Sequence, residues 1–586
     1  MTKKTKLELT WPGKEERPRL EPRILIEDPA KSYHAKVRRE GDIFDNMLIK
    51  GDNLLALKAL EQDYGGKVKC IYIDPPYNTG NAFDHYDDGL EHSVWLSLMK
   101  DRLHLLRSLL AEDGFLVCHI DDQESHYLKV VLDEIFGRQN YLSTFYAQVR
   151  YDNKTLAEDN AFQKVIEQCL VYAKDRTVAR PIKDKEPYKV EKFEWKITET
   201  ESGAKFEAGG KVVEVFKPDQ YKIEKIAPSE IGLKETWATG SLVRQSGSSG
   251  EFLDKHLIPR KGIDGLSCLY KVYGIGEDGL GFRYMTGPKK ESANKGKFYS
   301  GIPLKTLEKL KSGDSDKDKP IKNFYDFAAN FGNCRHEGGV DFRGGKKPEI
   351  LLQTIIQHFS ISGDLVLDSF AGSGTTAGVA HKMGRRWITV EIGEHADTHV
   401  LPRLQRVIDG TDQGGISKAV DWKGGGGFRY FTLAPSLLEQ DRFGNWVIAK
   451  DYNPTMLAEA MCKHMGFTYA PASDPQDYWR HGASTETDFI YVTTQALTHE
   501  ACAKIAHDVG PDRSLLICCK AFDADADAFE NLTLVKIPTS ILQKCEWGRD
   551  DYSLNIQNLP EADDAAEEAQ AMTEGLPLFA GEAGDE

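Results

Sequence analysis

Short apolar runs alternate with helical periodicity between residues 46 and 174. The runs Val68–Ile73 and Phe115–Ile120 each predict a buried strand. A helix between them is predicted by apolar residues at helical spacing: Leu96, Met99, Leu103, Leu106 and Leu110. Gly114 is expected to end that helix. Strands that alternate with helices favour βαβ units around a parallel sheet.

The same pattern resumes near residue 346. It predicts a helix over Glu349–Phe359, a strand over Leu365–Asp368, a helix after Thr376 and a strand over Trp387–Glu391. Between these two stretches the periodicity weakens, and Gly, Ser, Lys and aromatic residues accumulate. The pattern therefore predicts one α/β sheet whose two halves are separated by an inserted domain of mixed short elements.

Breaks in the pattern predict six segments. Prolines interrupt the polar N-terminal arm, and a glycine-rich stretch over 424–427 is interpreted as a linker before a further α/β module, whose strands are expected near 488–492 and 514–518. The predicted segments are an arm over 1–42, the first half of the catalytic domain over 43–174, the insert over 175–345, the second half over 346–423, the C-terminal α/β module over 424–560, and an acidic tail over 561–586.

Composition narrows the class of protein. A chain of 586 residues is too long for one hydrophobic core, and 40% hydrophobic with 28% charged residues is typical of a globular protein. Neither a membrane span nor a secretion signal is indicated, so we expect a cytoplasmic protein. The ten cysteines contain no CxxC pair, which predicts buried thiols and no metal site.

The net charge of −16, taken alone, argues against a nucleic-acid partner. Its distribution changes this picture, because the acidic tail lacks Lys and Arg whereas lysines cluster in the middle of the chain. These clusters are Lys289–Lys290, Lys295, Lys297 and Lys346–Lys347. They suit either phosphate contacts or an ordinary solvated surface.

The first motif with chemistry is Asp74-Pro75-Pro76-Tyr77, which follows the strand Val68–Ile73. The carboxyl ends of strands are where open α/β sheets hold ligands. Two prolines make the loop stiff and leave its carbonyls free to accept. The carboxylate of Asp74 and the carbonyl of Pro75 could each accept one N–H of an exocyclic amine such as that of adenine, while Tyr77 could stack on a flipped base. A rigid turn with a packed tyrosine would explain the motif without any chemistry.

The second motif is the turn after the strand Leu365–Asp368. Gly372 and Gly374 allow a tight turn and close approach of a ligand, although the third glycine of the dinucleotide fingerprint is missing. The next strand ends in Glu391, an acid suited to a ribose hydroxyl pair. A close helix–strand contact would explain the glycines equally well, and the joint occurrence of the two motifs favours function.

Together these motifs resemble the DNA amino-methyltransferases, in the circularly permuted (beta) class whose Asp-Pro-Pro-Tyr half comes first. The resemblance covers about 46–406 without most of the insert. Segments from Ile73 to Gly137, including Trp95, Arg102-Leu103 and His119–Glu124, resemble the modification subunits of type III restriction systems. It implies a Rossmann-like α/β fold that uses S-adenosylmethionine, with the insert as target-recognition domain.

The resemblance also implies roles for particular residues. Asp74, Pro75, Pro76 and Tyr77 would be catalytic. The cofactor would be held by Asp52 and Asn53 beside Gly51, by Lys347 beside Pro348, and by Asp368, Phe370, Ala371, Gly372, Ser373, Gly374, Thr375 and Glu391.

The sequence is compatible with more than one activity. A cytosine C5 enzyme is disfavoured because it needs a nucleophilic thiolate, and the chain has no Pro-Cys pair. Adenine N6 is favoured over cytosine N4 by the Asp before Pro-Pro-Tyr, again by resemblance. The chain could also be a non-catalytic DNA-recognition subunit that kept the fold, or a methyltransferase that acts on RNA.

Possible partners follow from the same resemblance. We expect double-stranded DNA as substrate and a homodimer as the assembly. The chain has no G-x-x-x-x-G-K-[ST] loop, so any cleavage would come from a separate restriction subunit. Independently of that family, the tail peptide Gly575–Phe579 resembles the Leu-x-Leu-Phe peptides that bind sliding clamps, and it could dock on a clamp or be inert.

Overall fold

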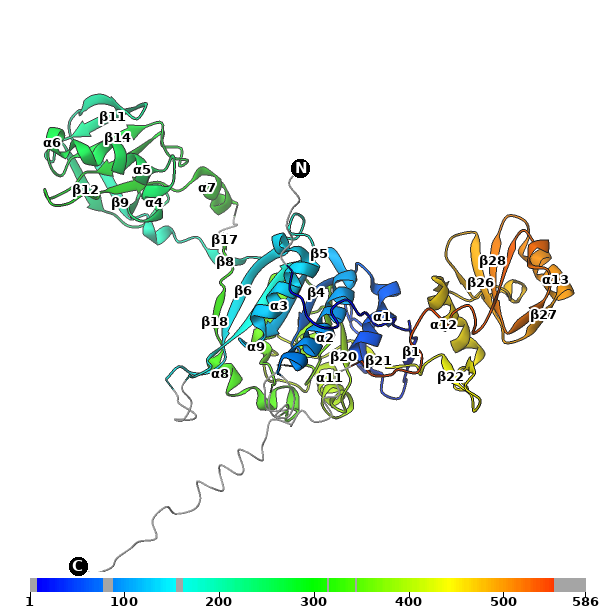
Figure 1. Ribbon diagram of the computed structural model, residues 1–586. Coiled ribbons are helices and arrows are strands. Elements are labelled where there is room, and N and C mark those ends of the chain that lie inside the picture. The colour runs from blue at the N-terminus through cyan, green and yellow to red at the C-terminus, as the bar shows by residue number, and fades with distance from the viewer. Residues whose placement is uncertain (1–7, 77–87, 154–161, 313–315, 343–344, 553–586) are drawn as a thin grey trace, which may run out of the picture. The chain divides into compact units, whose positions relative to one another are not determined.

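The computed structural model describes residues 8–76, 88–153, 162–312, 316–342 and 345–552. Contacts divide the chain into two compact units, one made of residues 1–182 and 322–586 and the other of Lys183–Ile321. The ribbon in Figure 1 follows both units along the chain.

A large mixed sheet organises the first unit. Its strands run in the order β1-β21-β3-β20-β19-β4-β5-β7-β6-β18, and β2 pairs with β21 beside this path. From β21 to β5 all neighbours are parallel, whereas β7 is antiparallel to both β5 and β6. The bounds are β1 Leu25–Glu27, β2 Tyr33–His34, β3 Asn46–Lys50, β4 Val68–Ile73, β5 Leu110–Ile120, β6 Tyr141–Gln148, β7 Ile166–Ala173, β18 Phe324–Asp326, β19 Leu365–Asp368, β20 Arg386–Glu391 and β21 Gly427–Leu433.

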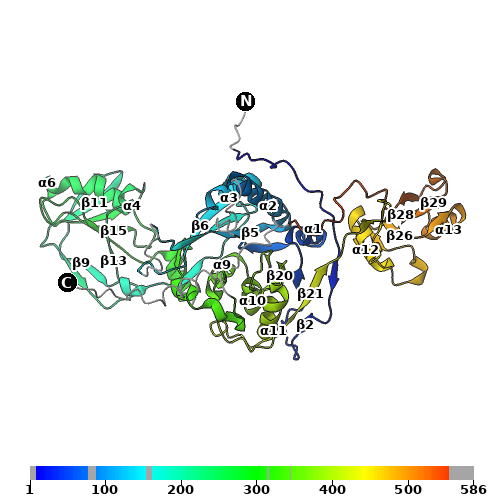
Figure 2. The ribbon, with the colours of Figure 1, turned by 60° about the horizontal axis from the view of Figure 1, so that its bottom comes forward.

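Helices cover both faces of this sheet. Figure 2 shows α1, α2 and α3 on one face and α9, α10 and α11 on the other. The core on the first face is built from the apolar stripe of α2, with Met99, Leu103 and Leu106 fully buried against the strands. The bounds are α1 Asn53–Tyr64, α2 Asp88–Leu109, α3 Ser125–Leu132, α8 Ala328–Phe331, α9 Glu349–Phe359, α10 Thr375–Lys382 and α11 Leu401–Ile408.

The second unit contains a six-stranded antiparallel sheet in the order β10-β11-β14-β15-β16-β13. Its core includes Val213, Tyr270 and Met285. The strand bounds are β8 Asp184–Pro187, β9 Trp195–Glu199, β10 Ala204–Ala208, β11 Lys211–Phe216, β12 Tyr221–Lys225, β13 Lys234–Trp237, β14 Leu269–Tyr273, β15 Phe282–Thr286, β16 Lys297–Ser300 and β17 Asp316–Lys319. The helices are α4 Ser241–Arg244, α5 Ser249–Phe252, α6 Lys261–Asp264 and α7 Leu304–Lys311.

The C-terminal part of the first unit contains a five-stranded sheet in the order β24-β25-β26-β28-β30. Its last three strands are parallel, and two of them, β26 and β28, confirm the strands predicted near 488–492 and 514–518. The bounds are β22 Leu438–Gln440, β23 Trp446–Ile448, α12 Pro454–Met465, β24 Thr468–Tyr469, β25 Gly482–Ala483, β26 Asp488–Val492, β27 Ala496–Thr498, α13 His499–Val509, β28 Ser514–Cys519, β29 Ala521–Asp523 and β30 Leu532–Lys536.

Segment boundaries differ from the sequence-based ones at three places. The described part of the arm is integrated into the first unit, because Trp11 is buried and β1 pairs with β21. Residue 427 begins β21, which pairs with β3, so the glycine stretch enters the large sheet instead of linking domains. The compact insert is Lys183–Ile321, narrower than 175–345, because β18 pairs with β6 of the large sheet.

The expectation for Gly114 was wrong. Helix α2 ends at Leu109, and Gly114 lies inside β5. A Cβ at this position would lie 2.9 Å from the carbonyl oxygens of Ala111 and Val68. The glycine is therefore explained by close backbone packing at the start of the strand.

All ten cysteines are buried and unpaired. Within the described part of the chain, helices that combine enough length and apolar character to cross a bilayer are absent.

Candidate active site

The two sequence motifs meet at one edge of the large sheet. Strand β4 leads into Asp74, and its neighbour β19 ends in Asp368; the two strands are parallel, with Val366 opposite Cys70 and Leu367 opposite Ile71. The carboxyl ends of parallel strands lie at the same edge, so both motif loops leave the sheet side by side. This is the arrangement that the sequence predicts for one shared site.

The loop after β4 is held from two sides. The indole N–H of Trp95 on α2 donates to the carbonyl of Pro76 at 3.0 Å, and Trp95 is fully buried. Pro75 is buried as well. The carboxylate of Asp74 contacts Lys347, with Oδ2 2.9 Å from Nζ. Tyr77 lies outside the described residues, so its predicted stacking role stays a prediction.

The glycine turn has a different environment at each glycine. Both adopt positive φ, +52° at Gly372 and +73° at Gly374. A Cβ at Gly374 would lie 2.9 Å from Val400 Cγ1, whereas a Cβ at Gly372 would meet no atom within 4 Å. Gly374 is thus required by packing. Gly372 borders open space, which is where a ligand could approach the backbone.

Glu391, at the end of β20, fixes this turn. Its carboxylate accepts hydrogen bonds from the backbone N–H of Gly372 at 2.7 Å and of Gly393 at 2.9 Å. Each carboxylate oxygen keeps a further lone pair for another donor. The acid predicted to hold ribose hydroxyls therefore also positions the backbone of the glycine turn.

Burial dominates the electrostatics of Asp368. It raises the pKa of this carboxyl to about 7, and the negative fields of Asp74 and Glu391 act in the same direction. The backbone N–H of Phe370, 2.9 Å from Oδ1, and the hydroxyl of Thr376 partly oppose the shift. The charge of Asp368 is thus disfavoured by its burial and by the two neighbouring carboxylates.

The remaining residues of the turn are anchored to the protein. Phe370 packs against the hydrophobic core, and the N–H of Ala371 donates to Val390 at 3.0 Å. The buried guanidinium of Arg403 donates to the carbonyl of Ser373 at 3.2 Å and to Thr375 Oγ1 at 2.7 Å. These two hydrogen bonds anchor the glycine turn to helix α11, which carries Arg403.

Arg403 belongs to a buried charge network. Its Nη2 donates to Glu349 at 2.8 Å, and Lys382 donates to the same carboxylate at 2.7 and 2.9 Å. Lys382 also lies 2.6 Å from Asp412. Although burial raises the pKa of Glu349, the two cations Arg403 and Lys382 outweigh it, and the net shift is downward.

Asp52 and Asn53 sit at the start of α1, next to the same edge. Asn53 donates to the carbonyl of Ser369 at 2.8 Å, which ties the helix to the glycine turn. Asp52 caps α1 through Leu55 N and lies 3.4 Å from Arg102. The backbone N–H of Tyr552 also donates to Asp52 at 3.1 Å. Arg102 and two backbone N–H groups thus already contact the Asp52 carboxylate, and its predicted role in holding the cofactor stays a prediction.

Lys346 and Lys347 are not surface cations, contrary to their place among the basic clusters. Both are at least nine-tenths buried. Lys346 donates to the carbonyls of Arg335, Glu337 and Val340, and burial lowers its pKa to about 8. Lys347 has a raised pKa, because Asp74 and Glu167 outweigh the lowering effect of its burial.

Three residues beside the Lys347–Asp74 ion pair have no role assigned from the sequence. Tyr72, His119 and Glu167 lie on the adjacent strands β4, β5 and β7. The Tyr72 hydroxyl is 2.8 Å from His119 Nδ1, and His119 Nε2 is 2.8 Å from Glu167 Oε2. The signal that could have found Tyr72 and His119 is a polar residue inside an otherwise apolar buried run. Glu167 lies near the exposed start of β7 and gives no such signal.

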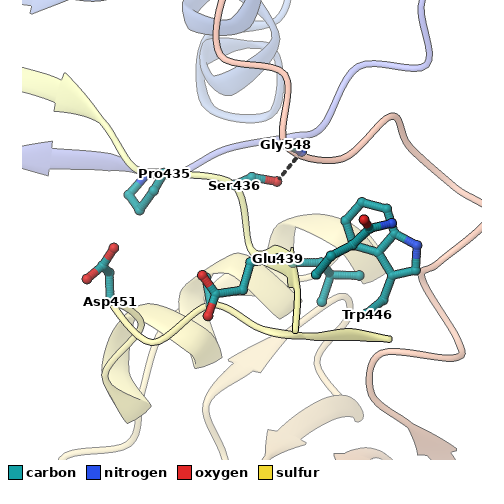
Figure 3. A pocket seen from close by; sticks show the side chains of 9 residues that line it. Pro435, Ser436, Glu439, Trp446, Asp451 and Gly548 are labelled. Atoms are coloured by element: carbon teal, nitrogen blue, oxygen red, sulfur yellow. Dashed lines mark hydrogen bonds between the residues drawn. The ribbon is translucent and has the colours of Figure 1, made fainter. Parts of the chain in front are cut away.

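A cavity of about 410 Å³ lies elsewhere, in the C-terminal part of the first unit (Figure 3). It is lined by Pro435, Ser436, Leu438, Glu439, Gln440, Trp446, Ala449, Asp451 and Gly548. None of these belongs to either motif, so the candidate active site rests on the convergence of the motifs and not on cavity size.

The fold and site define a Rossmann-like α/β protein of the DNA methylase class. A family model described as DNA methylase, for N6 and N4 enzymes, matches residues 68–399, which is more than half of the chain. The chain belongs to this family. The circular permutation remains a prediction.

Three curated relatives are modification (Mod) subunits. The chain is 34% identical over 438 residues to the probable type III restriction-modification enzyme HindVI Mod subunit of Haemophilus influenzae, covering 68% of this chain and 55% of the relative. It is 28% identical over 423 residues to the EcoPI Mod subunit of Escherichia phage P1, covering 63% and 60%. It is 25% identical over 584 residues to the EcoP15I Mod subunit of Escherichia coli, covering 86% and 84%. The chain thus spans less than two thirds of the first two relatives.

Proposed function

We propose that the protein transfers a methyl group from S-adenosylmethionine to the N6 amine of adenine in double-stranded DNA, as the modification component of a restriction-modification system. The observation that carries the proposal is the position of Asp74 and the Gly372–Gly374 turn at the carboxyl ends of the adjacent parallel strands β4 and β19. Family membership and the names of the Mod relatives support the same activity.

The residues around the turn fit a nucleoside cofactor. Gly372 faces open space, Glu391 has acceptor capacity beyond its two backbone donors, and the buried hydroxyl of Ser369 has no partner among the described residues. We infer that Gly372 allows close approach of the cofactor and that Glu391 accepts from its ribose hydroxyls. When bound, S-adenosylmethionine supplies a methyl group on a positively charged sulfonium.

The loop after β4 fits the amine. The lone pair of an adenine amine is delocalised into the ring, so an acceptor must restrain its N–H bonds for the lone pair to face the methyl donor. We propose that Asp74 and the carbonyl of Pro75 are these acceptors, and that Tyr77 stacks on the flipped base. Trp95 supports this role because its bond to Pro76 restricts movement of the loop.

The second unit is the candidate for target recognition. Lys289, Lys290 and Lys295 are exposed, and Trp237 is 54% exposed with the ammonium of Lys297 4.7 Å from its ring centroid. Lys297 itself pairs with Glu235 at 2.7 Å, so phosphate contact is assigned to the three exposed lysines and base stacking to Trp237.

We propose a homodimer with a separate restriction subunit, located in the cytoplasm, where DNA and S-adenosylmethionine occur together.

Methyl incorporation tests the proposal. The purified full chain is incubated with isotope-labelled S-adenosylmethionine and duplex DNA, single-stranded DNA or RNA, and the products are hydrolysed to nucleosides for mass spectrometry. We expect labelled N6-methyladenine from duplex DNA. Labelled N4-methylcytosine instead would reject the choice of base, and label in RNA alone would reject the substrate class.

Two variants connect this activity to the site. Asp74→Ala is expected to reduce the methylation rate at least about 1000-fold, because the amine loses its charged acceptor, while cofactor affinity changes little. Asp113→Ala is the matched control, since Asp113 pairs with Lys69 on the surface. Retained turnover in Asp74→Ala would reject the assignment of the catalytic residue.

A further inference from the structure

We propose that Glu167 is a positioning residue for methyl transfer, which acts through Lys347 to fix the carboxylate of Asp74. This inference rests on the proposed function and adds to it a residue outside both sequence motifs. Lys347 Nζ lies 2.9 Å from Asp74 Oδ2 and 3.7 Å from Glu167 Oε2. One buried ammonium therefore lies between the proposed catalytic carboxylate and a second carboxylate.

The sheet brings these groups to one face. Val117 is opposite Tyr72, and Cys169 is opposite His119. Residues two apart along a strand share a face, so Tyr72, His119 and Glu167 project to the same side of three adjacent strands. Lys347 reaches this side from the segment that precedes α9, and Pro348 caps that helix.

His119 lies directly against Glu167. Its Nε2 is 2.8 Å from Glu167 Oε2, and its Nδ1 is 2.8 Å from the Tyr72 hydroxyl. His119 is completely buried, and Glu167 is 18% exposed. This close contact with the imidazole limits the positions that the Glu167 carboxylate can take beside Lys347.

Charge explains why a second carboxylate matters. A buried ammonium with Asp74 as its single anionic neighbour would attract that carboxylate strongly and compete with the substrate amine for it. Glu167 shares the ammonium, so Asp74 keeps acceptor capacity for an N–H donor while its orientation stays fixed. Neutralising Glu167 is therefore expected to weaken catalysis more than binding.

The first experiment measures steady-state methylation by the full chain carrying Glu167→Gln. Glutamine keeps the shape of the side chain but removes the charge that faces Lys347. We expect kcat to fall at least about tenfold, with KM for DNA and for S-adenosylmethionine within about twofold of wild type. The control is Glu112→Gln, on β5, where Glu112 is 74% exposed and pairs with Lys174.

A double-mutant cycle then asks whether Glu167 acts through Lys347. If it does, Glu167→Gln changes kcat less than about twofold in a Lys347→Met background. Should Lys347→Met lack measurable steady-state turnover, the cycle uses the single-turnover rate of methyl transfer at excess enzyme instead of kcat.

Each outcome has one meaning. Wild-type kcat in Glu167→Gln overturns the positioning role, and so does an equal loss in both the wild-type and Lys347→Met backgrounds. A melting temperature that falls together with kcat in Glu167→Gln also overturns it in favour of a structural role. A wild-type chain that transfers no methyl group to DNA rejects the proposed function itself, which is a different result.

Discussion

The backbone N–H of Gly372 donates to Glu391 Oε2 at 2.7 Å. This bond joins the glycine turn after β19 to the end of the neighbouring strand β20. A ribose-binding acid that also orders the backbone beside the ligand would couple two contributions to affinity: the acceptor itself and the preformed shape of the turn.

Replacing Glu391 should therefore weaken cofactor binding strongly. Glu391→Ala removes the acceptor and frees the N–H groups of Gly372 and Gly393, so we expect S-adenosylhomocysteine to bind at least about tenfold more weakly, or about 1.4 kcal/mol. Calorimetric titration measures this affinity. Glu394→Ala is the control, because Glu394 is exposed and pairs with Lys50. Equal affinities in the two variants would contradict the role of Glu391.

Substitution of Gly372 and substitution of Gly374 by alanine should have different effects. Gly372→Ala places a methyl group in open space at positive φ, so we expect a stability loss of about 1–2 kcal/mol and at least tenfold weaker binding of S-adenosylhomocysteine. Gly374→Ala meets Val400 at 2.9 Å and should destabilise the fold more. Urea denaturation and titration measure both effects. If Gly372→Ala bound S-adenosylhomocysteine as tightly as wild type, the cofactor would not bind at this turn.

Asp368 should make stability depend on pH. Its pKa in the folded chain is about 7, against an ordinary value of 3.8, chiefly because the carboxyl is buried. Between these two pH values the folded chain retains a proton that the unfolded chain has released, so the free energy of unfolding falls as pH rises through this window.

Asp368→Asn has no charge to bury and should lose this dependence. Relative to its value near pH 4, the stability difference between variant and wild type should shift in favour of the variant by at least about 1 kcal/mol at pH 8. Denaturant unfolding across this range measures it. A stability difference that stays constant with pH would contradict the raised pKa.

The buried charge network of Glu349, Lys382 and Arg403 should be needed for folding. Glu349→Ala removes the carboxylate shared by Lys382 and Arg403 and leaves buried cations with fewer partners, which costs about 3–5 kcal/mol. Thermal unfolding measures the loss. Glu112→Ala, at a surface ion pair, should leave the melting temperature within about 2 °C of wild type. A similarly small change in Glu349→Ala would show that the network contributes little.

The convergence of the two motifs was predictable because both follow strand ends. Asp74 and the glycine turn each come directly after an apolar run, and the ends of adjacent parallel strands necessarily share an edge. Helix α9 and strand β4 have the bounds that periodicity indicates, because their buried residues form unbroken patterns.

Other features depend on pairing between distant strands. Glu167 reaches Lys347 because β7 is antiparallel to β5, and local sequence does not reveal that register. The glycines at 424–427 predict a linker because glycine is flexible in isolation, yet Gly427 begins strand β21, which pairs with β3. The burial of Lys346 follows from three carbonyls that converge on its ammonium, a property of the folded loop.

A crystal structure of the full chain with S-adenosylhomocysteine tests the central claim most directly, namely that the loop after β4 and the turn after β19 form one site. The account predicts that the ligand lies over Gly372, with its ribose hydroxyls at Glu391 and its sulfur facing the Asp74 loop. A ligand bound instead in the cavity lined by Trp446 and Gly548, with the Gly372 turn empty, would contradict it.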